Sequence, residues 1–202
     1  MIKFSQISQE LNKYKPFDAD EARALAQISS YVARVGGADG ANILRCIDRA
    51  TLEGHLTASA WVVDKTRQFA LLLHHAKLNL WLQPGGHIDA EDGAIDVAAR
   101  RELAEESGLI DVLAVHEGLF DVDAHSIPAR SRTDIETMET MIEPAHWHYD
   151  LRFAYSAPDK NLVKCSDESH GFSWVEISSL CGDETDASIR RLAQKTAFLQ
   201  LA

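Results

Sequence analysis

Residues 85–109 read GGHIDAEDGAIDVAARRELAEESGL, and this stretch decides how the rest of the chain is interpreted. Its alanine-rich part, residues 94–107, predicts a helix because alanine is the best helix former. Gly108 is placed to end that helix, since glycine readily adopts the left-handed conformation that follows a last helical turn. Gly85 and Gly86 predict a tightly folded loop ahead of the helix. We therefore expect a glycine loop that leads into a single helix.

Three glutamates give the predicted helix an acidic face. Glu102, Glu105 and Glu106 stand at positions i, i+3 and i+4, which lie on one side of a helix. Their like charges repel one another, and a divalent cation such as Mg²⁺ removes the repulsion because it prefers oxygen ligands. The neighbouring Arg101 could orient one carboxylate through a two-pronged hydrogen bond. The residues expected to face the core are Ile95, Ala98, Ala99 and Leu103.

An acidic cluster of this kind is, by itself, usually a solvated helix face. The surrounding pattern changes that interpretation, because the stretch resembles the signature of the Nudix family, G-x5-E-x7-R-E-U-x-E-E-x-G-U, where U is a bulky aliphatic residue. Gly86 matches the first glycine, and the whole second half is matched by Arg101, Glu102, Leu103, Glu105, Glu106, Gly108 and Leu109. Beyond the signature, the resemblance runs from about residue 55 to the end of the chain.

Two features depart from the family's pattern. The spacing from Gly86 to Arg101 is one residue longer than the signature. Counted from Gly86, the family's first glutamate falls on Asp92, with Glu91 beside it. In the family that glutamate commonly supports the site rather than serving as the main metal ligand. The departures therefore concern the junction between loop and helix more than the metal site.

The resemblance implies an α/β/α sandwich around a mixed sheet, with the signature forming a loop, a helix and a second loop. It also implies a metal site for Mg²⁺, with Mn²⁺ as a substitute. By this analogy Glu105 and Glu106 are the leading ligands, Glu102 is a ligand or a base, and a backbone carbonyl of the loop at Gly86 joins them. Arg101 would orient Glu102.

The same resemblance implies one further carboxylate from a late loop. Glu168 lies six residues before Trp174, at the position where the family often places such a group. As a base or an extra ligand it would complete the site. The alternative is an exposed loop acid without a catalytic role.

The rest of the chain is expected to divide into a helical extension over residues 1–50 and the main domain over residues 51–202. Asp18 can cap the second N-terminal helix, whose buried side is predicted to consist of Ala22, Leu25, Ala26, Ile28 and Val32. Strands are predicted at residues 56–63, 69–73, 112–122, 146–156 and 172–177, and a closing helix at 188–201. Residues 126–144 are predicted to form a mobile loop or a short excursion.

Histidines recur near the predicted site without a clear role. His146 and His148 alternate along a predicted strand, so they face the same side and could touch substrate or metal. A partly exposed sheet face is the simpler interpretation. His87 follows the glycines and lies close to the proposed phosphate site, while His74 and His75 end a buried strand. Separately, we expect Trp81 in the core or the cleft wall.

Composition limits the classes of function. The chain has 202 residues, of which 46% are hydrophobic and 25% charged, as in a globular protein of ordinary composition. Its formal charge of −11 argues against non-specific binding to nucleic acid or anionic membranes. We find no apolar run of about eighteen residues and no signal-peptide pattern. The three cysteines, Cys46, Cys165 and Cys181, are expected to be buried free thiols in a reducing cytoplasm.

The leading hypothesis is a metal-dependent hydrolase that cleaves a phosphoanhydride bond in a nucleoside diphosphate linked to another moiety. Its partner would be a small phosphorylated molecule, most simply a nucleotide derivative. An isoprenoid diphosphate isomerase is a weaker alternative, because no cysteine lies in the context that such enzymes use. A non-catalytic nucleotide sensor would typically have lost signature glutamates, and all three are present. The N-terminal helices could regulate the protein or join a homodimer.

Overall fold

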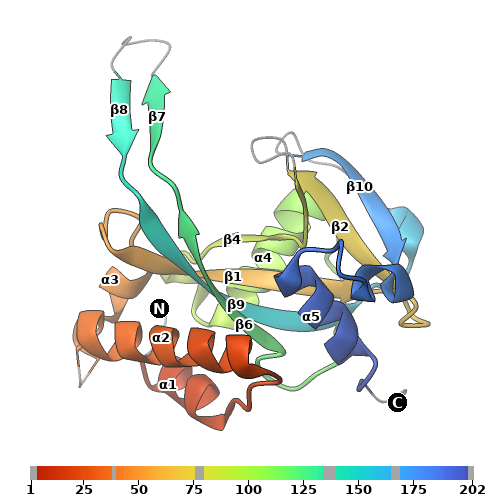
Figure 1. The fold of residues 1–202 in the computed structure, drawn as a ribbon, viewed down its shortest axis with the longest axis horizontal. Coiled ribbons are helices and arrows are strands. Elements are labelled where there is room, and N and C mark those ends of the chain that lie inside the picture. The colour runs from red at the N-terminus through yellow and green to blue at the C-terminus, as the bar shows by residue number, and fades with distance from the viewer. Residues whose placement is uncertain (1–3, 38–39, 76–79, 134–139, 165–168, 200–202) are drawn as a thin grey trace.

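The computed structural model describes residues 4–37, 40–75, 80–133, 140–164 and 169–199. An eight-stranded sheet forms the centre, and a two-stranded sheet projects from it (Figure 1). The main sheet consists of β1 (Gly54–Val63), β2 (Phe69–His75), β3 (Leu80–Leu82), β4 (Gly85–His87), β5 (Leu113–Ala114), β6 (Asp121–Ile127), β9 (His146–Ser156) and β10 (Ser169–Glu176). The projecting sheet consists of β7 (Arg130–Thr133) and β8 (Thr140–Glu143). The α-helices are α1 (Phe4–Lys13), α2 (Ala19–Val35), α3 (Ile43–Ile47), α4 (Ile95–Ser107) and α5 (Ala187–Thr196).

The main sheet is mixed. Its strands follow the order β10-β2-β1-β9-β5, with β3 beside β2, β4 beside β1 and β6 beside β9. The central pair, β1 and β9, is parallel over ten residue pairs, while the other pairings in the sheet are antiparallel. Three short 3₁₀ helices complete the described elements, namely η1 (Ala90–Asp92), η2 (Lys160–Leu162) and η3 (Ile177–Cys181).

Side chains on β1 alternate between two faces of the sheet. Leu56, Ala58, Ala60 and Val62 enter one hydrophobic cluster together with residues of α1, α2 and α4. Trp61 and Val63 enter a second cluster with residues of α5. Figure 1 shows α4 behind the sheet and α5 in front of it. The expected α/β/α sandwich is therefore confirmed.

The second N-terminal helix begins as predicted, because the Asp18 side chain accepts a hydrogen bond from the backbone N–H of Glu21 at 2.7 Å. Its buried side differs from the prediction. Ala22 and Ala26 are exposed, and the buried residues are Glu21, Ala24, Ile28, Tyr31 and Val32. The buried side of α2 differs from the predicted one because two of its polar side chains have hydrogen-bond partners inside the protein. Tyr31 donates to the carbonyl of Gly54, and Glu21 receives the ammonium group of Lys195.

Two further predictions differ from the structure, and one predicted alternative is confirmed. The single strand expected at residues 112–122 is divided into β5 and β6, because Gly118 adopts a φ of 71° in the turn between them. For residues 126–144 the alternative of a short excursion is confirmed, since β7 and β8 pair there. The closing helix α5 ends at Thr196 rather than at residue 201.

Cys46 is a buried free thiol as expected, whereas Cys181 is free but exposed, and Cys165 lies outside the described residues. Within the described ranges, none of the helices combines the length and the apolar character that a membrane crossing requires.

Candidate functional site

The glycine loop is held against the centre of the sheet. Strand β4 pairs with β1 so that Gly85 lies opposite Ser59 and Gly86 lies opposite Ala58. A Cβ atom added to Gly85 would stand 2.7 Å from the Cα atom of Ser59. One added to Gly86 would stand 2.4 Å from the carboxylate oxygen Oε2 of Glu102. Gly85 is therefore required by its close approach to backbone, whereas a side chain at Gly86 would displace the Glu102 carboxylate.

Helix α4 lies with its apolar side on the sheet. The four residues expected to face the core are all buried, as the sequence predicted: Ile95, Ala98, Ala99 and Leu103. Gly108 ends the helix in the left-handed conformation with a φ of 72°, and its N–H donates to the carbonyl of Ala104. These contacts fix the rotation of the helix, and the glutamates lie away from the core.

The three glutamates differ in their surroundings. Glu106 accepts a hydrogen bond from the backbone N–H of Gly85 at 2.9 Å. The Glu102 carboxylate packs on Gly86 with only 14% of the side chain exposed, whereas 59% of the Glu105 side chain is exposed. Burial raises the pKa of Glu102, although the hydrogen bond from Arg101 acts in the opposite direction. Glu102 and Glu106 are thus bound to the glycine loop, and Glu105 faces solvent.

Arg101 makes its two-pronged contact with Asp92. Its Nε donates to Oδ1 at 2.8 Å and its NH2 donates to Oδ2 at 3.0 Å, while NH1 reaches Glu102 at 2.9 Å and Glu105 at 3.1 Å. The expected two-pronged bond is therefore made to Asp92, which stands at the family's first glutamate position counted from Gly86, and not to one of the three clustered glutamates. The N–H of Asp89 also donates to Asp92.

Electrostatic interactions between Asp92 and Arg101 keep both side chains ionised. Burial alone would raise the pKa of Asp92, but the hydrogen bonds from Arg101 outweigh burial and hold the pKa below its ordinary value. Arg101 has a raised pKa, and Asp92 is the main cause. Glu91, the other candidate at this position, is exposed. Asp92 is therefore the residue that supports Arg101.

A cluster of histidines lies on the other face of the same strands. His55 on β1 lies opposite His148 on β9 in the parallel register, and His87 on β4 lies opposite Thr57, two residues along β1. The ring centroid of His55 is 4.9 Å from that of His87 and 4.7 Å from that of His148. Because alternate residues of a strand face opposite sides, these histidines lie away from the face on which α4 packs.

Sequence reasoning noticed His87, His146 and His148 but missed His55, which is only 2% exposed. The sequence did contain a signal, because His55, Thr57 and Ser59 are alternate residues of one strand and therefore face the same side. That pattern identifies a face of β1 but not the strand beside it. The other neighbour of this cluster is His125 on β6, which lies opposite His148 in the antiparallel register.

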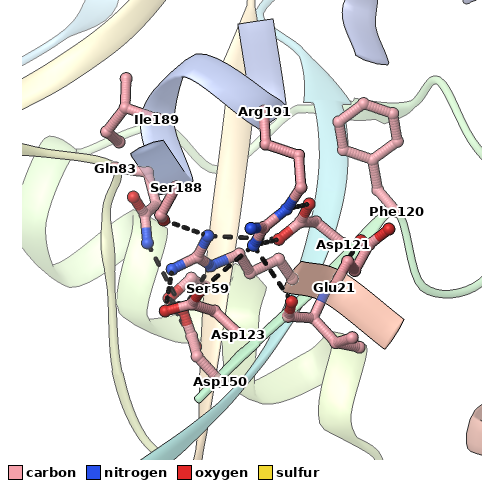
Figure 2. A network of polar contacts seen from close by, with 12 residues as sticks. Glu21, Ser59, Gln83, Phe120, Asp121, Asp123, Asp150, Ser188, Ile189 and Arg191 are labelled. Carbon is pink, nitrogen blue, oxygen red and sulfur yellow. Dashed lines mark hydrogen bonds and ion pairs between the residues drawn. The ribbon is translucent and has the colours of Figure 1, made fainter. Parts of the chain in front are cut away.

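A buried ionic network continues along the same face (Figure 2). Asp150 accepts hydrogen bonds from Thr57 at 3.0 Å, from Ser59 at 2.8 and 2.9 Å, and from the Nε of Arg152 at 2.7 Å. Arg152 also donates to Ser188 in the first turn of α5 at 2.6 Å. The network therefore ties the two central strands to the helix in front of the sheet.

Asp121 is the centre of the same network. Arg191 contacts its two oxygens at 2.9 Å each, Arg152 donates to it at 3.2 Å, and Lys195 donates at 3.2 Å. Lys195 also reaches Glu21 on α2 at 2.6 Å. The N-terminal helices are thus joined to β6 and α5 by charge as well as by hydrophobic packing.

The remaining candidates are placed less centrally. Glu168 lies outside the described residues, as does the side chain of His75. Trp81 is 45% exposed rather than part of the core, and its ring contacts that of His74 at a centroid distance of 5.0 Å. The site that the structure brings together therefore consists of the glycine loop, the three glutamates, Arg101 and Asp92.

Comparisons with known proteins agree with this arrangement. A model of the NUDIX domain matches residues 54–194. The fold is similar to that of a C. elegans Ap4A hydrolase, with 21% identity, a TM-score of 0.50, and coverage of 71% of this chain and 96% of that one. It is also similar to the E. coli dihydroneopterin triphosphate pyrophosphohydrolase, with 13% identity, a TM-score of 0.53, and coverage of 71% and 94%. At these identities the likeness concerns the fold alone. No curated protein matches the chain.

Proposed function

The chain belongs to the Nudix family and is a Nudix-type hydrolase, and we propose that it cleaves a phosphoanhydride bond in a nucleoside diphosphate linked to another moiety, with the aid of a divalent cation. One observation carries the proposal. The backbone of the glycine loop holds two of the three glutamates, through the hydrogen bond from Gly85 to Glu106 and the contact of Gly86 with Glu102. Loop and helix thus present carboxylates together.

The donor set fits Mg²⁺ or its substitute Mn²⁺. All the side chains concerned offer carboxylate oxygens, which are the ligands that hard cations prefer. The missing Cβ of Gly86 lets the Glu102 carboxylate lie directly against the loop backbone. Glu105, Glu106, Glu102 and the carbonyl of Gly86 would hold the cation, which supplies neutralisation of the diphosphate and polarisation of the phosphorus.

The protein's own groups would carry the proton and fix the geometry. Glu102 would serve either as a further ligand or as the general base, and its raised pKa makes its carboxylate a stronger base. Arg101, held by Asp92, keeps the Glu102 carboxylate oriented through its NH1. Glu168 stands as a second candidate for the base. Catalysis of phosphoryl transfer depends mainly on such positioning and on charge stabilisation.

A nucleotide derivative is the proposed substrate class. The similar solved proteins are named as hydrolases of Ap4A and of dihydroneopterin triphosphate, both of which contain phosphoanhydride bonds. The formal charge of −11 makes a cation necessary for an anionic substrate to approach. We further propose that the protein works in the cytoplasm, where such metabolites occur and where the free thiols of Cys46 and Cys181 would stay reduced.

The test measures phosphate or nucleotide release from a panel of nucleoside diphosphate derivatives. Dialysis against a chelator should abolish turnover, and Mg²⁺ or Mn²⁺ alone should restore it. Glu106→Gln should lower kcat by orders of magnitude without unfolding the protein. Asp96→Asn, an exposed acid on the same helix, is the matched control and should behave like wild type. Full activity in the metal-free protein would refute the mechanism, and tight binding without turnover would favour a sensor.

A further inference from the structure

Three histidines from three strands meet at one point of the sheet. His55, His87 and His148 offer ring nitrogens that all lie within 4.8 Å of one another. In the described part of the chain, these three histidines are the group of potential ligands whose spacing suits a metal ion. The group contains no glutamate. The cluster lies on the face of β1 and β4 opposite to α4, so it is separate from the glutamate site.

The surroundings of His55 are the second observation. Both of its ring nitrogens are buried and lack a hydrogen-bond partner. A buried polar atom without a partner costs free energy, and native proteins rarely keep one without a reason. A cation at the centre of the three rings would satisfy the nitrogen that faces it.

The cluster is suited to a cation and not to an anion. Burial, with nearby positive groups, lowers the pKa of His55 to about 4 and that of His148 to about 2. Burial thus favours the uncharged form of the rings, which does not attract a phosphate. Neutral imidazole is the form that binds metal ions.

We propose that His55, His87 and His148 form a second cation site, which binds a transition-metal ion such as Zn²⁺. Three imidazoles are a common zinc ligand set, whereas Mg²⁺ prefers oxygen. Zn–N distances of about 2.0–2.1 Å place the nitrogens of a tetrahedral site about 3.4 Å apart. Because His55 stacks on His87 with an interplanar angle of 29°, ligation would need the rings to rotate as well as to approach one another.

His146 lies beside the three histidines, next to His148. Its Nδ1 lies 2.9 Å from the carbonyl oxygen of Pro144, to which it must donate, so Nε2 keeps its lone pair. That Nε2 lies 3.3 Å from Nε2 of His148, the separation expected of two ligands in a tetrahedral site. A backbone carbonyl behind a ligating histidine is also the usual outer contact in zinc sites.

The proposed ion would stabilise the glycine loop against which the glutamates pack. It would join β1, β9 and β4, and β4 contains both glycines. The carbonyl of His87 accepts a hydrogen bond from NH2 of Arg101 at 2.8 Å, so the two sites share this segment of backbone. The role is therefore structural, and it does not depend on the hydrolase mechanism.

The experiment measures zinc content and zinc affinity of the full chain without a polyhistidine tag. Metal-free protein is dialysed against Zn²⁺ in the presence of excess Mg²⁺, which occupies the carboxylate ligands. Wild type should retain a single zinc ion and gain thermal stability. Substitution of Co²⁺ should give the absorption bands of a tetrahedral nitrogen site. His148→Gln should weaken zinc binding by more than the roughly 10–100-fold that loss of an outer contact costs.

Controls separate the cluster from other histidines and from the glutamates. His116→Gln changes an exposed histidine outside the cluster and should bind zinc like wild type. Glu106→Gln should also keep the zinc ion. Circular dichroism checks that His148→Gln and His87→Gln are folded, since both positions are only half-buried. Absence of zinc binding by the wild type, equal binding by folded His148→Gln, or loss of zinc in Glu106→Gln would each overturn the proposal.

Discussion

Gly86 lies so close to Glu102 that a Cβ atom on the glycine would stand 2.4 Å from the carboxylate oxygen Oε2. The contact joins the loop to the helix at the point where the acidic face begins. Gly85 is equally crowded, but its neighbour is the backbone of Ser59 at 2.7 Å. A side chain at Gly86 would therefore meet a flexible carboxylate, whereas a side chain at Gly85 would meet rigid backbone.

Alanine at each glycine should separate these two roles. Gly86→Ala should lower kcat strongly with little change in the free energy of unfolding, because the end of the Glu102 side chain can move aside. Gly85→Ala should destabilise the protein by about 1–3 kcal/mol, because Ser59 backbone cannot move aside without strain. Urea unfolding and steady-state kinetics measure both effects. A Gly86→Ala variant with normal kcat would show that the position of Glu102 is unimportant for turnover.

Replacement of Asp92 should release Arg101. The Asp92 side chain is 5% exposed, and Asp92→Asn removes the charge that receives two hydrogen bonds from the guanidinium. We expect a loss of about 1.5–3 kcal/mol in stability and a lower kcat. Glu91→Gln, one residue away and exposed, is the control and should change neither. Equal effects at both positions would mean that Asp92 is not the residue that replaces the family's glutamate.

Stability in acid should depend on Asp121. Burial would raise the pKa of Asp121, but the hydrogen bonds and charges of Arg191, Arg152 and Lys195 outweigh it and hold the pKa below its ordinary value. Below about pH 4 the unfolded chain takes up a proton that the native carboxylate does not, so stability should fall as the pH decreases toward the native pKa. Urea unfolding between pH 5 and pH 3 measures the slope.

Asp121→Asn should flatten that slope and destabilise the protein at pH 7 by about 3–5 kcal/mol, because buried cations lose their partner. The control is Asp183→Asn, which changes a fully exposed acid paired with Arg190 and should leave stability unchanged. If the wild-type slope persisted in Asp121→Asn, other acids would be responsible for the sensitivity.

Glu168 remains the least supported residue of the proposed site. If it is the base or an extra ligand, Glu168→Gln should reduce kcat strongly with little change in KM. If it is an exposed loop acid, the variant should resemble wild type in activity and stability. Asp167→Gln tests whether loop charge alone matters. Small, equal effects at both positions would leave the role of base to Glu102.

Local patterns in the sequence were sufficient for the elements that depend on their own residues. The helix over residues 94–107, its end at Gly108 and its buried side were predicted because alanine content, helical spacing and a terminal glycine all act within one segment. The strand at residues 146–156 was predicted with the bounds that the structure has. The acidic face follows from the same helical spacing, so the glutamates could be grouped without a structure.

Contacts between distant segments required the tertiary structure. His55 and His148 are 93 positions apart in the sequence and become neighbours because β1 and β9 pair in parallel, a register that neither strand encodes by itself. The pairing of Arg101 with Asp92 depended on how the chain turns between η1 and α4. Glu21 faces inward because Lys195, from the far end of the chain, lies there to receive it. Spacing fixes which side chains share a face, but only folding decides what that face meets.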